Sequence, residues 1–188
     1  MEDKKLFWKS LGSEHALDTR WLKVKKETVE LPNGKILDDF YTVEGGELIA
    51  ILAVDRDNNV FLVKQYRHAV GDVTIDLPGG GVEKGEQPID AARRELAEET
   101  GMLANHMEKL LTYYPDSGRT TCTKHIFLAT ELKEDTGNSY SQDESENIRL
   151  IRMSLEELLE KMKSGEMKEA TLHVGVSSYL SRNEFGKE

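Results

Sequence analysis

Residues 77–102 read LPGGGVEKGEQPIDAARRELAEETGM, and this stretch decides the fold. A glycine-rich segment leads into a run of alanine, leucine and charged residues that is typical of a helix. Pro88 suits the first helical turn, where its missing N–H costs nothing, and Gly101 suits the left-handed residue that ends a helix. The stretch therefore predicts a glycine loop followed by a helix of roughly fourteen residues.

Three glutamates share one face of this helix. Glu95, Glu98 and Glu99 stand at i, i+3 and i+4, which places their Cβ atoms within about 5–6 Å of one another. Like charges at this spacing repel, so the cluster is unfavourable unless something positive lies against it. Mg²⁺ prefers carboxylate oxygens, and Mn²⁺ is an alternative. On spacing alone, a metal site and a solvated acidic face remain equal alternatives.

The spacing of the fixed residues in this stretch resembles a complete Nudix box, the signature of the Nudix hydrolases. The matching residues are Gly80, Glu86, Arg94, Glu95, Leu96, Glu98, Glu99, Gly101 and Met102. The resemblance implies an α+β fold, the α/β/α sandwich of the family, in which helices flank a mixed sheet. Two alternating segments joined by a turn at residues 31–34 predict an N-terminal antiparallel hairpin before that sheet. The resemblance also implies a loop-helix-loop unit that binds divalent metal and the diphosphate of a nucleoside diphosphate linked to another group.

The resemblance also implies roles for the residues of the box. Metal would be held by Glu95, Glu99 and the Gly79 carbonyl, with Glu98 as a third ligand or as a base. Gly81 would contact the substrate. The expected structural residues are Gly80, Glu86, Arg94 and Gly101. Of these, Glu86 and Arg94 are expected to form an ion pair that holds the glycine loop against the helix.

Residues outside the box resemble the ADP-ribose pyrophosphatase branch of the family. That resemblance implies substrate contacts by Arg67, Ser117 and Gly118, although the branch usually carries Pro-Gly where Ser117-Gly118 stands. It also implies that Glu144 is the general base and that Glu146 contacts metal. Without the resemblance, Arg67 is an ordinary surface arginine, and residues 133–147 are a solvated acidic loop.

Composition limits the class of protein. The 188 residues are 38% hydrophobic, which suits one domain, and the net charge of −10 argues against a nucleic-acid partner. No stretch approaches the roughly 18 apolar residues of a membrane span. The single Cys122 excludes an internal disulfide, and no secretory leader is evident, so we expect a cytoplasmic protein.

Apolar patterning and turn residues predict the remaining elements. The predicted strands are residues 17–30, 36–43, 49–54, 60–63, 107–114 and 121–130. A capping box beginning at Ser154 predicts a helix to about Lys163, which Gly165 ends. A last helix is expected from near Met167.

Two segments are expected along the chain. Residues 1–45 form the N-terminal hairpin, and residues 46–188 form the Nudix hydrolase domain. Trp8 and Trp21 both lie in the first segment, and an exposed tryptophan suits a nucleobase platform, although core packing is the alternative. The resemblance adds that dimers of this branch share base-stacking residues, so we expect a homodimer in which Trp21 contacts the substrate.

The expected activity is Mg²⁺-dependent hydrolysis of a nucleoside diphosphate sugar, with ADP-ribose the leading substrate, to a nucleoside monophosphate and a sugar phosphate. A Nudix hydrolase of nucleoside triphosphates or dinucleoside polyphosphates is the first alternative. A non-catalytic domain that senses a nucleotide sugar is the second, and the intact box disfavours it.

Overall fold

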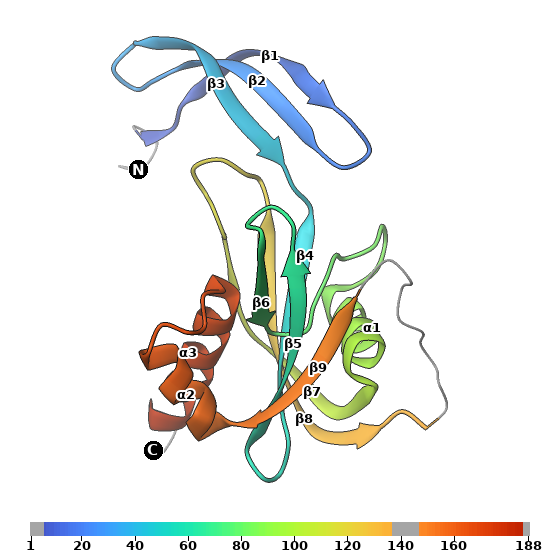
Figure 1. The fold of residues 1–188 in the computed structure, drawn as a ribbon. Coiled ribbons are helices and arrows are strands. Elements are labelled where there is room, and N and C mark those ends of the chain that lie inside the picture. The colour runs from blue at the N-terminus through green and yellow to red at the C-terminus, as the bar shows by residue number, and fades with distance from the viewer. Residues whose placement is uncertain (1–5, 137–146, 186–188) are drawn as a thin grey trace. The chain divides into compact units, whose positions relative to one another are not determined.

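The computed structural model describes residues 6–136 and 147–185, with side chains to residue 182 (Figure 1). The described residues fall into two compact units. The first extends to Gly46 and includes Tyr114–Thr123, and the second comprises Glu47–Tyr113 and the chain from Lys124 onward. Among the described residues, no helix is long and apolar enough to cross a membrane.

The first unit contains a three-stranded antiparallel sheet rather than a two-stranded hairpin. Its strands, in spatial order, are β1 (Lys9–Asp18), β2 (Lys23–Glu30) and β3 (Ile36–Glu44). The predicted strand at 17–30 is interrupted because the Thr19 hydroxyl and the Leu22 backbone N–H and carbonyl close a turn, with both O···O and N···O distances 2.9 Å. The antiparallel β2–β3 pair agrees with the expected hairpin.

The second unit is built on a six-stranded sheet. Its strands are β4 (Glu47–Val54), β5 (Asn59–Arg67), β6 (Asp72–Asp76), β7 (Met102–Tyr113), β8 (Thr123–Glu134) and β9 (Ile148–Ser154). The order is β6-β5-β4-β8-β7, with β9 paired to β5. The predicted central strands are confirmed as β4 and β5. The predicted turn between them is also present, and Asp55 Oδ1 closes it by accepting the backbone N–H groups of Asp57 and Asn59.

Helices cover both faces of this sheet (Figure 1). They are α1 (Pro88–Thr100), α2 (Leu155–Lys163) and α3 (Ala170–Phe185). Strand β4 divides its side chains between two cores: Ile49 and Ile51 pack with Leu96 of α1. Ala50, Leu52 and Val54 belong to a second core with residues of α2 and α3. This arrangement is the expected α/β/α sandwich, with a sheet buried on both faces.

The helix boundaries follow the local signals in the sequence. Pro88 opens α1, and Gly101 ends it with a φ of 67°. Ser154 caps α2 by accepting the Glu157 N–H, so the predicted capping position is confirmed. The last helix begins at Ala170 instead of near Met167.

A buried carboxyl lies at the end of β6, directly before the glycine loop. Asp76 is 8% exposed, and its Oδ1 accepts the Leu77 N–H at 2.8 Å. Burial raises the pKa of Asp76 to about 6 from its ordinary 3.8, even though the Leu77 hydrogen bond acts in the opposite direction. Because the unfolded chain ionises first, the folding cost is absent below about pH 3.8, grows as pH rises, and is complete above about pH 6.

We therefore expect Asp76→Asn to stabilise the fold at pH 7 by up to about 3 kcal/mol, since each pKa unit corresponds to about 1.36 kcal/mol. Urea unfolding at pH 7 and pH 4 measures the effect, which should largely vanish at pH 4. Asp72 of the same strand is the control, because its hydrogen bond with Lys168 lowers its pKa. Asp72→Asn should therefore bring no gain at pH 7, and equal effects of the two variants would contradict the assignment.

Candidate active site

The glycine loop is attached to the first half of β4. The Ile51 N–H donates to the Pro78 carbonyl at 2.8 Å, and the Ile49 N–H donates to the Gly80 carbonyl at 2.9 Å. Val82 returns a bond of 3.0 Å from its N–H to the Glu47 carbonyl. These bonds pair the loop with β4 in the way that a neighbouring strand would pair with it. The backbone position of the loop is therefore set by a strand that is buried on both faces.

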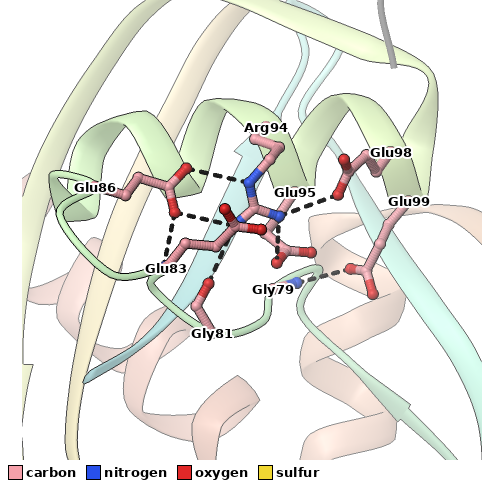
Figure 2. Close-up of polar contacts among 8 residues, drawn as sticks. All are labelled: Gly79, Gly81, Glu83, Glu86, Arg94, Glu95, Glu98 and Glu99. Carbon is pink, nitrogen blue, oxygen red and sulfur yellow. Dashed lines mark hydrogen bonds and ion pairs between the residues drawn. The ribbon is translucent and has the colours of Figure 1, made fainter. Parts of the chain in front are cut away.

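Arg94 ties the same loop to α1 (Figure 2). Its Nε and Nη2 both donate to the Glu86 carboxylate at 3.1 Å, and Nη2 also donates to the Gly81 carbonyl at 3.1 Å. The predicted ion pair between Glu86 and Arg94 is present, and it is bidentate. Hydrogen bonding by Arg94 lowers the pKa of Glu86, and hydrogen bonding by Glu86 raises the pKa of the guanidinium. The pair therefore stays charged over the working pH range.

Two further contacts of Arg94 were not predicted from the sequence. Its Nη1 donates to Glu95 at 2.8 Å and to Glu98 at 3.1 Å, so one guanidinium faces three carboxylates. The i,i+4 spacing of Arg94 and Glu98 is the signal that could have indicated the second contact. The positive charge offsets the repulsion expected among the glutamates, and it holds Glu95 and Glu98 at the side of the loop.

Glu99 meets the loop from the helix. Its Oε2 accepts the Gly79 N–H at 2.7 Å (Figure 2). The carboxylate and the glycine that were predicted as metal ligands are thus neighbours in space, although 20 residues separate them. A hydrogen bond from a backbone N–H to a carboxylate is among the stronger protein hydrogen bonds, so it orients the Glu99 side chain.

The donor groups of this site suit a hard divalent cation. Glu95, Glu98 and Glu99 offer carboxylate oxygens and the loop offers backbone carbonyls, which are the ligand types that Mg²⁺ and Mn²⁺ prefer. Among the residues that the structure describes, no three acidic, histidine or cysteine side chains already converge as a metal cluster. Glu95 and Glu98 turn toward Arg94, while Glu99 turns toward Gly79. The donor chemistry fits a metal. The carboxylates lie around the loop, but they do not point toward one common position.

The space beside Gly80 shows how closely loop and helix meet. A Cβ built on Gly80 would lie 2.2 Å from Glu95 Oε1, while its backbone has no positive φ. The obstacle is the end of a flexible side chain. A methyl group would therefore displace the Glu95 carboxylate rather than break the fold.

We expect Gly80→Ala to lower kcat by about tenfold to a hundredfold, because misplacing a catalytic group by about 1 Å can cost about 10² in rate. The melting temperature should change little. Gly46→Ala is the control, since a Cβ there meets nothing within 4 Å. A Gly80→Ala variant with normal turnover would show that the position of the Glu95 carboxylate does not matter.

The other predicted site residues lie in both units. Arg67 is exposed at the end of β5 in the second unit, where it pairs with Asp72 across the β5–β6 ladder. Trp21, Ser117 and Gly118 are exposed residues of the first unit. The candidate base Glu144 and the candidate ligand Glu146 lie outside the described residues.

Comparison with known proteins identifies the family. A family model described as the NUDIX domain matches residues 47–174. The chain belongs to the Nudix family. A second model, described as the nucleoside diphosphate sugar hydrolase N-terminal domain, matches residues 8–43. As a Nudix hydrolase, the chain is a pyrophosphohydrolase, and hydrolases of this family generally use divalent metal ions.

Individual relatives match over most of the chain. An ADP-ribose pyrophosphatase of Bacillus subtilis is 33% identical over 167 residues, which cover 89% of each chain. A methanol dehydrogenase activator of Bacillus methanolicus is 31% identical and covers 94% of each. A crystal structure titled ADP compounds hydrolase superposes with a TM-score of 0.85 at 20% identity over 96% of both chains, which supports the same Nudix fold.

Proposed function

We propose that this Nudix hydrolase cleaves the diphosphate of nucleoside diphosphate sugars, with ADP-ribose as the leading substrate, in a Mg²⁺-dependent reaction. The products are a nucleoside monophosphate and a sugar phosphate. The observation that carries the proposal is the approach of the glycine loop to the acidic face of α1, where Gly79 bonds to Glu99 and Arg94 reaches Glu95 and Glu98. The relatives named ADP-ribose pyrophosphatase support the choice of substrate.

The residues proposed to hold metal are Glu95, Glu98, Glu99 and Glu146, together with the Gly79 carbonyl. A bound divalent cation would neutralise the diphosphate and lower the pKa of a water molecule. The loop bonds to β4 hold the backbone around Gly79, and the Arg94 contacts hold Glu95 and Glu98 beside it. Glu144 is the proposed general base that takes the proton from the attacking water, and Glu98 fills that role in the alternative assignment.

Substrate contacts are proposed for four further positions. Arg67 offers a guanidinium to a phosphate, and Gly81, Ser117 and Gly118 offer backbone or hydroxyl groups to the rest of the substrate. Gly80, Glu86, Arg94 and Gly101 are assigned structural roles, because they shape the loop and end the helix. Gly101 donates its N–H to the Ala97 carbonyl at 2.9 Å, which closes α1.

A substrate panel tests the proposal. The purified protein is assayed with Mg²⁺ against ADP-ribose, other nucleoside diphosphate sugars, nucleoside triphosphates and dinucleoside polyphosphates. We expect kcat/KM for a nucleoside diphosphate sugar to exceed that for the other classes by at least about tenfold, or 1.4 kcal/mol. A higher value for triphosphates or dinucleoside polyphosphates would move the protein to another Nudix branch.

A regulatory function is the second candidate, and one observation favours it. The relative named methanol dehydrogenase activator is 31% identical to this chain and covers 94% of it. An activator that acts only by binding would show no turnover on the panel, whereas an activator that hydrolyses a nucleotide would show it. The panel therefore separates a sensing Nudix domain from a hydrolase.

We also propose that residues 1–45 serve dimerisation and substrate contact, and that the enzyme is a homodimer whose hydrolase domain spans residues 46–188. The support is the unusual surface of the first unit, where β1 is exposed at every position. Within residues 6–45, the exposed large apolar side chains are Leu6, Phe7, Trp8, Leu11, Leu17, Trp21, Leu22, Ile36 and Tyr41. Clustered exposed apolar residues indicate an interaction surface.

Trp21 is the proposed base platform. Its side chain is 84% exposed, and the Arg20 guanidinium lies 4.6 Å from the ring centroid. Because its ring is not part of a core, Trp21→Ala should leave the fold intact. Stacking of a base contributes about 1–3 kcal/mol, so the substitution should raise KM for a nucleotide sugar by roughly tenfold to a hundredfold. Trp21→Phe keeps a ring and should restore most of the affinity.

Light scattering at assay concentration tests the dimer. A monomer, or a Trp21→Ala variant with normal KM, would contradict the proposed role of the first unit. The proposed compartment is the cytoplasm, where the one thiol of the chain, the buried Cys122, stays reduced.

A further inference from the structure

His125 is a buried histidine that the proposed chemistry does not use. It lies on β8, and its side chain is 10% exposed. Its Nδ1 is 2.8 Å from the Thr112 hydroxyl on the neighbouring strand β7. Its Nε2 is buried and has no hydrogen-bond partner among the described protein groups. A buried polar atom without a partner is costly, so it calls for a partner that moves or a functional role.

One group is placed to become that partner. Glu47 Oε1 lies 3.6 Å from His125 Nε2, slightly beyond hydrogen-bond distance. The Glu47 carboxylate is 54% exposed, so it can move toward the ring without leaving a packed core. If the Thr112 hydroxyl donates to Nδ1, the neutral ring carries its proton on Nε2 and presents a donor to the Glu47 carboxylate.

Glu47 is also the residue at which the glycine loop returns to the sheet. It is the first residue of β4, and its carbonyl accepts the Val82 N–H at 3.0 Å. The next residue, Leu48, forms a β-bridge with Gly81. The side chain of Glu47 therefore faces a buried histidine while its backbone holds the far end of the loop that begins with Gly79.

We propose that His125 is a positioning residue for the glycine loop. Its Nε2–H anchors the Glu47 carboxylate, the anchored residue fixes the start of β4, and the start of β4 holds Gly81 and Val82 in place. The part of this inference that concerns loop order is independent of the reaction. The part that concerns metal affinity rests on the proposed function, because the Gly79 carbonyl is a ligand only if the site holds a metal.

Two substitutions of His125 separate its two nitrogens. In His125→Gln, the longer side chain places an amide nitrogen near the position of Nε2, so the donor to Glu47 is kept. In His125→Asn, the shorter side chain reaches only the position of Nδ1 and keeps the Thr112 contact alone. Because Gln is also closer to His in volume than Asn, the Glu47 variants, which leave the core intact, separate the hydrogen bond from core filling.

Amide hydrogen exchange of the metal-free protein is the first readout. We expect the Val82 amide to exchange about tenfold faster in His125→Asn than in wild type, and His125→Gln to restore most of the protection. The Leu155 amide is the internal control. It donates to the carbonyl of Asn58, directly before β5, at 2.9 Å, and its exchange should not change. Equal protection of Val82 in all three proteins would overturn the proposal.

Glu47→Ala keeps the experiment decisive if the histidine variants unfold. Its half-exposed side chain can be removed without opening a core, and it should accelerate Val82 exchange as much as His125→Asn does. Glu47→Gln keeps an acceptor oxygen and should behave as wild type. Normal Val82 protection in Glu47→Ala would show that the side chain does not hold the loop.

Mn²⁺ binding, followed by electron paramagnetic resonance, tests the link to the proposed site. We expect His125→Asn to weaken Mn²⁺ affinity about threefold to tenfold and His125→Gln to restore it. Faster Val82 exchange with unchanged Mn²⁺ affinity would confine the role of His125 to loop order and overturn the link to metal. Undetectable Mn²⁺ binding in wild type would count against the proposed function, while the exchange result would still decide the positioning role.

Discussion

Replacing Glu99 by Gln is expected to remove most of the turnover while leaving the fold intact. The neutral amide cannot balance the charge of a divalent cation, and its oxygen is a weaker ligand than a carboxylate. Glu99 lies at the meeting point of α1 and the loop, where its Oε2 accepts the Gly79 N–H. We expect kcat to fall by about 10²-fold or more at saturating Mg²⁺, which corresponds to about 2.7 kcal/mol or more.

Steady-state kinetics with a metal titration measures this loss. Glu156→Gln is the matched control, because Glu156 is an exposed glutamate in the first turn of α2 and belongs to another helix. It should retain wild-type kcat. A Glu99→Gln variant with more than about a tenth of wild-type turnover, a loss of under roughly 1.4 kcal/mol, would count against the metal assignment.

Glu144→Gln is expected to have the second largest effect. A general base contributes typically 10²–10⁴ in rate, so kcat should fall by about 10²-fold or more with little change in KM. The prediction rests on resemblance alone, since Glu144 lies outside the described residues. Kinetics can identify a base regardless of where the side chain rests before substrate binds.

Glu146→Gln and Glu98→Gln complete that experiment. If Glu144 is the base, raising the Mg²⁺ concentration should not rescue Glu144→Gln, whereas it should partly rescue the loss of the ligand Glu146. A negligible effect of Glu144→Gln would move the role of base to Glu98 or Glu146. Arg94 Nη1 contacts both Glu95 and Glu98, so Glu98 belongs to the same group of side chains as the proposed metal ligands.

Much of the second unit could be predicted because its local signals and its packing agree. Pro88 and Gly101 bracket α1 in both sequence and structure, and Ser154 caps α2. Strand β4 was predicted from an uninterrupted apolar run, and the structure shows why: alternate residues of that run enter different cores. Periodicity alone does not distinguish a strand buried on both faces from a buried helix segment. Here the turn residue Asp55 directly follows the run and limits its length, which favours a strand.

The first unit was harder to predict. Strand β1 is exposed along its whole length, so it lacks the alternation of apolar and polar residues on which strand prediction depends. The turn that separates β1 from β2 is closed by a threonine side chain at Thr19 rather than by glycine or proline. The first strand therefore carries no pattern that predicts it, and the turn at Thr19 can be recognised only from the backbone geometry.

The sequence predicted which side chains lie beside the glycine loop, but not all of their contacts. Spacing placed Glu95, Glu98 and Glu99 on one face, but it could not show that Arg94 would reach two of them. The ion pair of Arg94 with Glu86 was predicted because the two residues lie at opposite ends of the loop-helix unit. His125 could not be singled out, since Thr112 and Glu47, which face its two ring nitrogens, come from two other strands.

The most direct test of the proposed function is phosphorus NMR of ADP-ribose incubated with the enzyme and Mg²⁺. Hydrolysis of the diphosphate should replace its two coupled signals with two phosphomonoester signals, those of AMP and ribose 5-phosphate. Glu99→Gln under the same conditions should leave the diphosphate signals almost unchanged. Persistence of the diphosphate signals with the wild-type enzyme would contradict ADP-ribose as a substrate, and the same outcome with every nucleoside diphosphate sugar would contradict the proposed function.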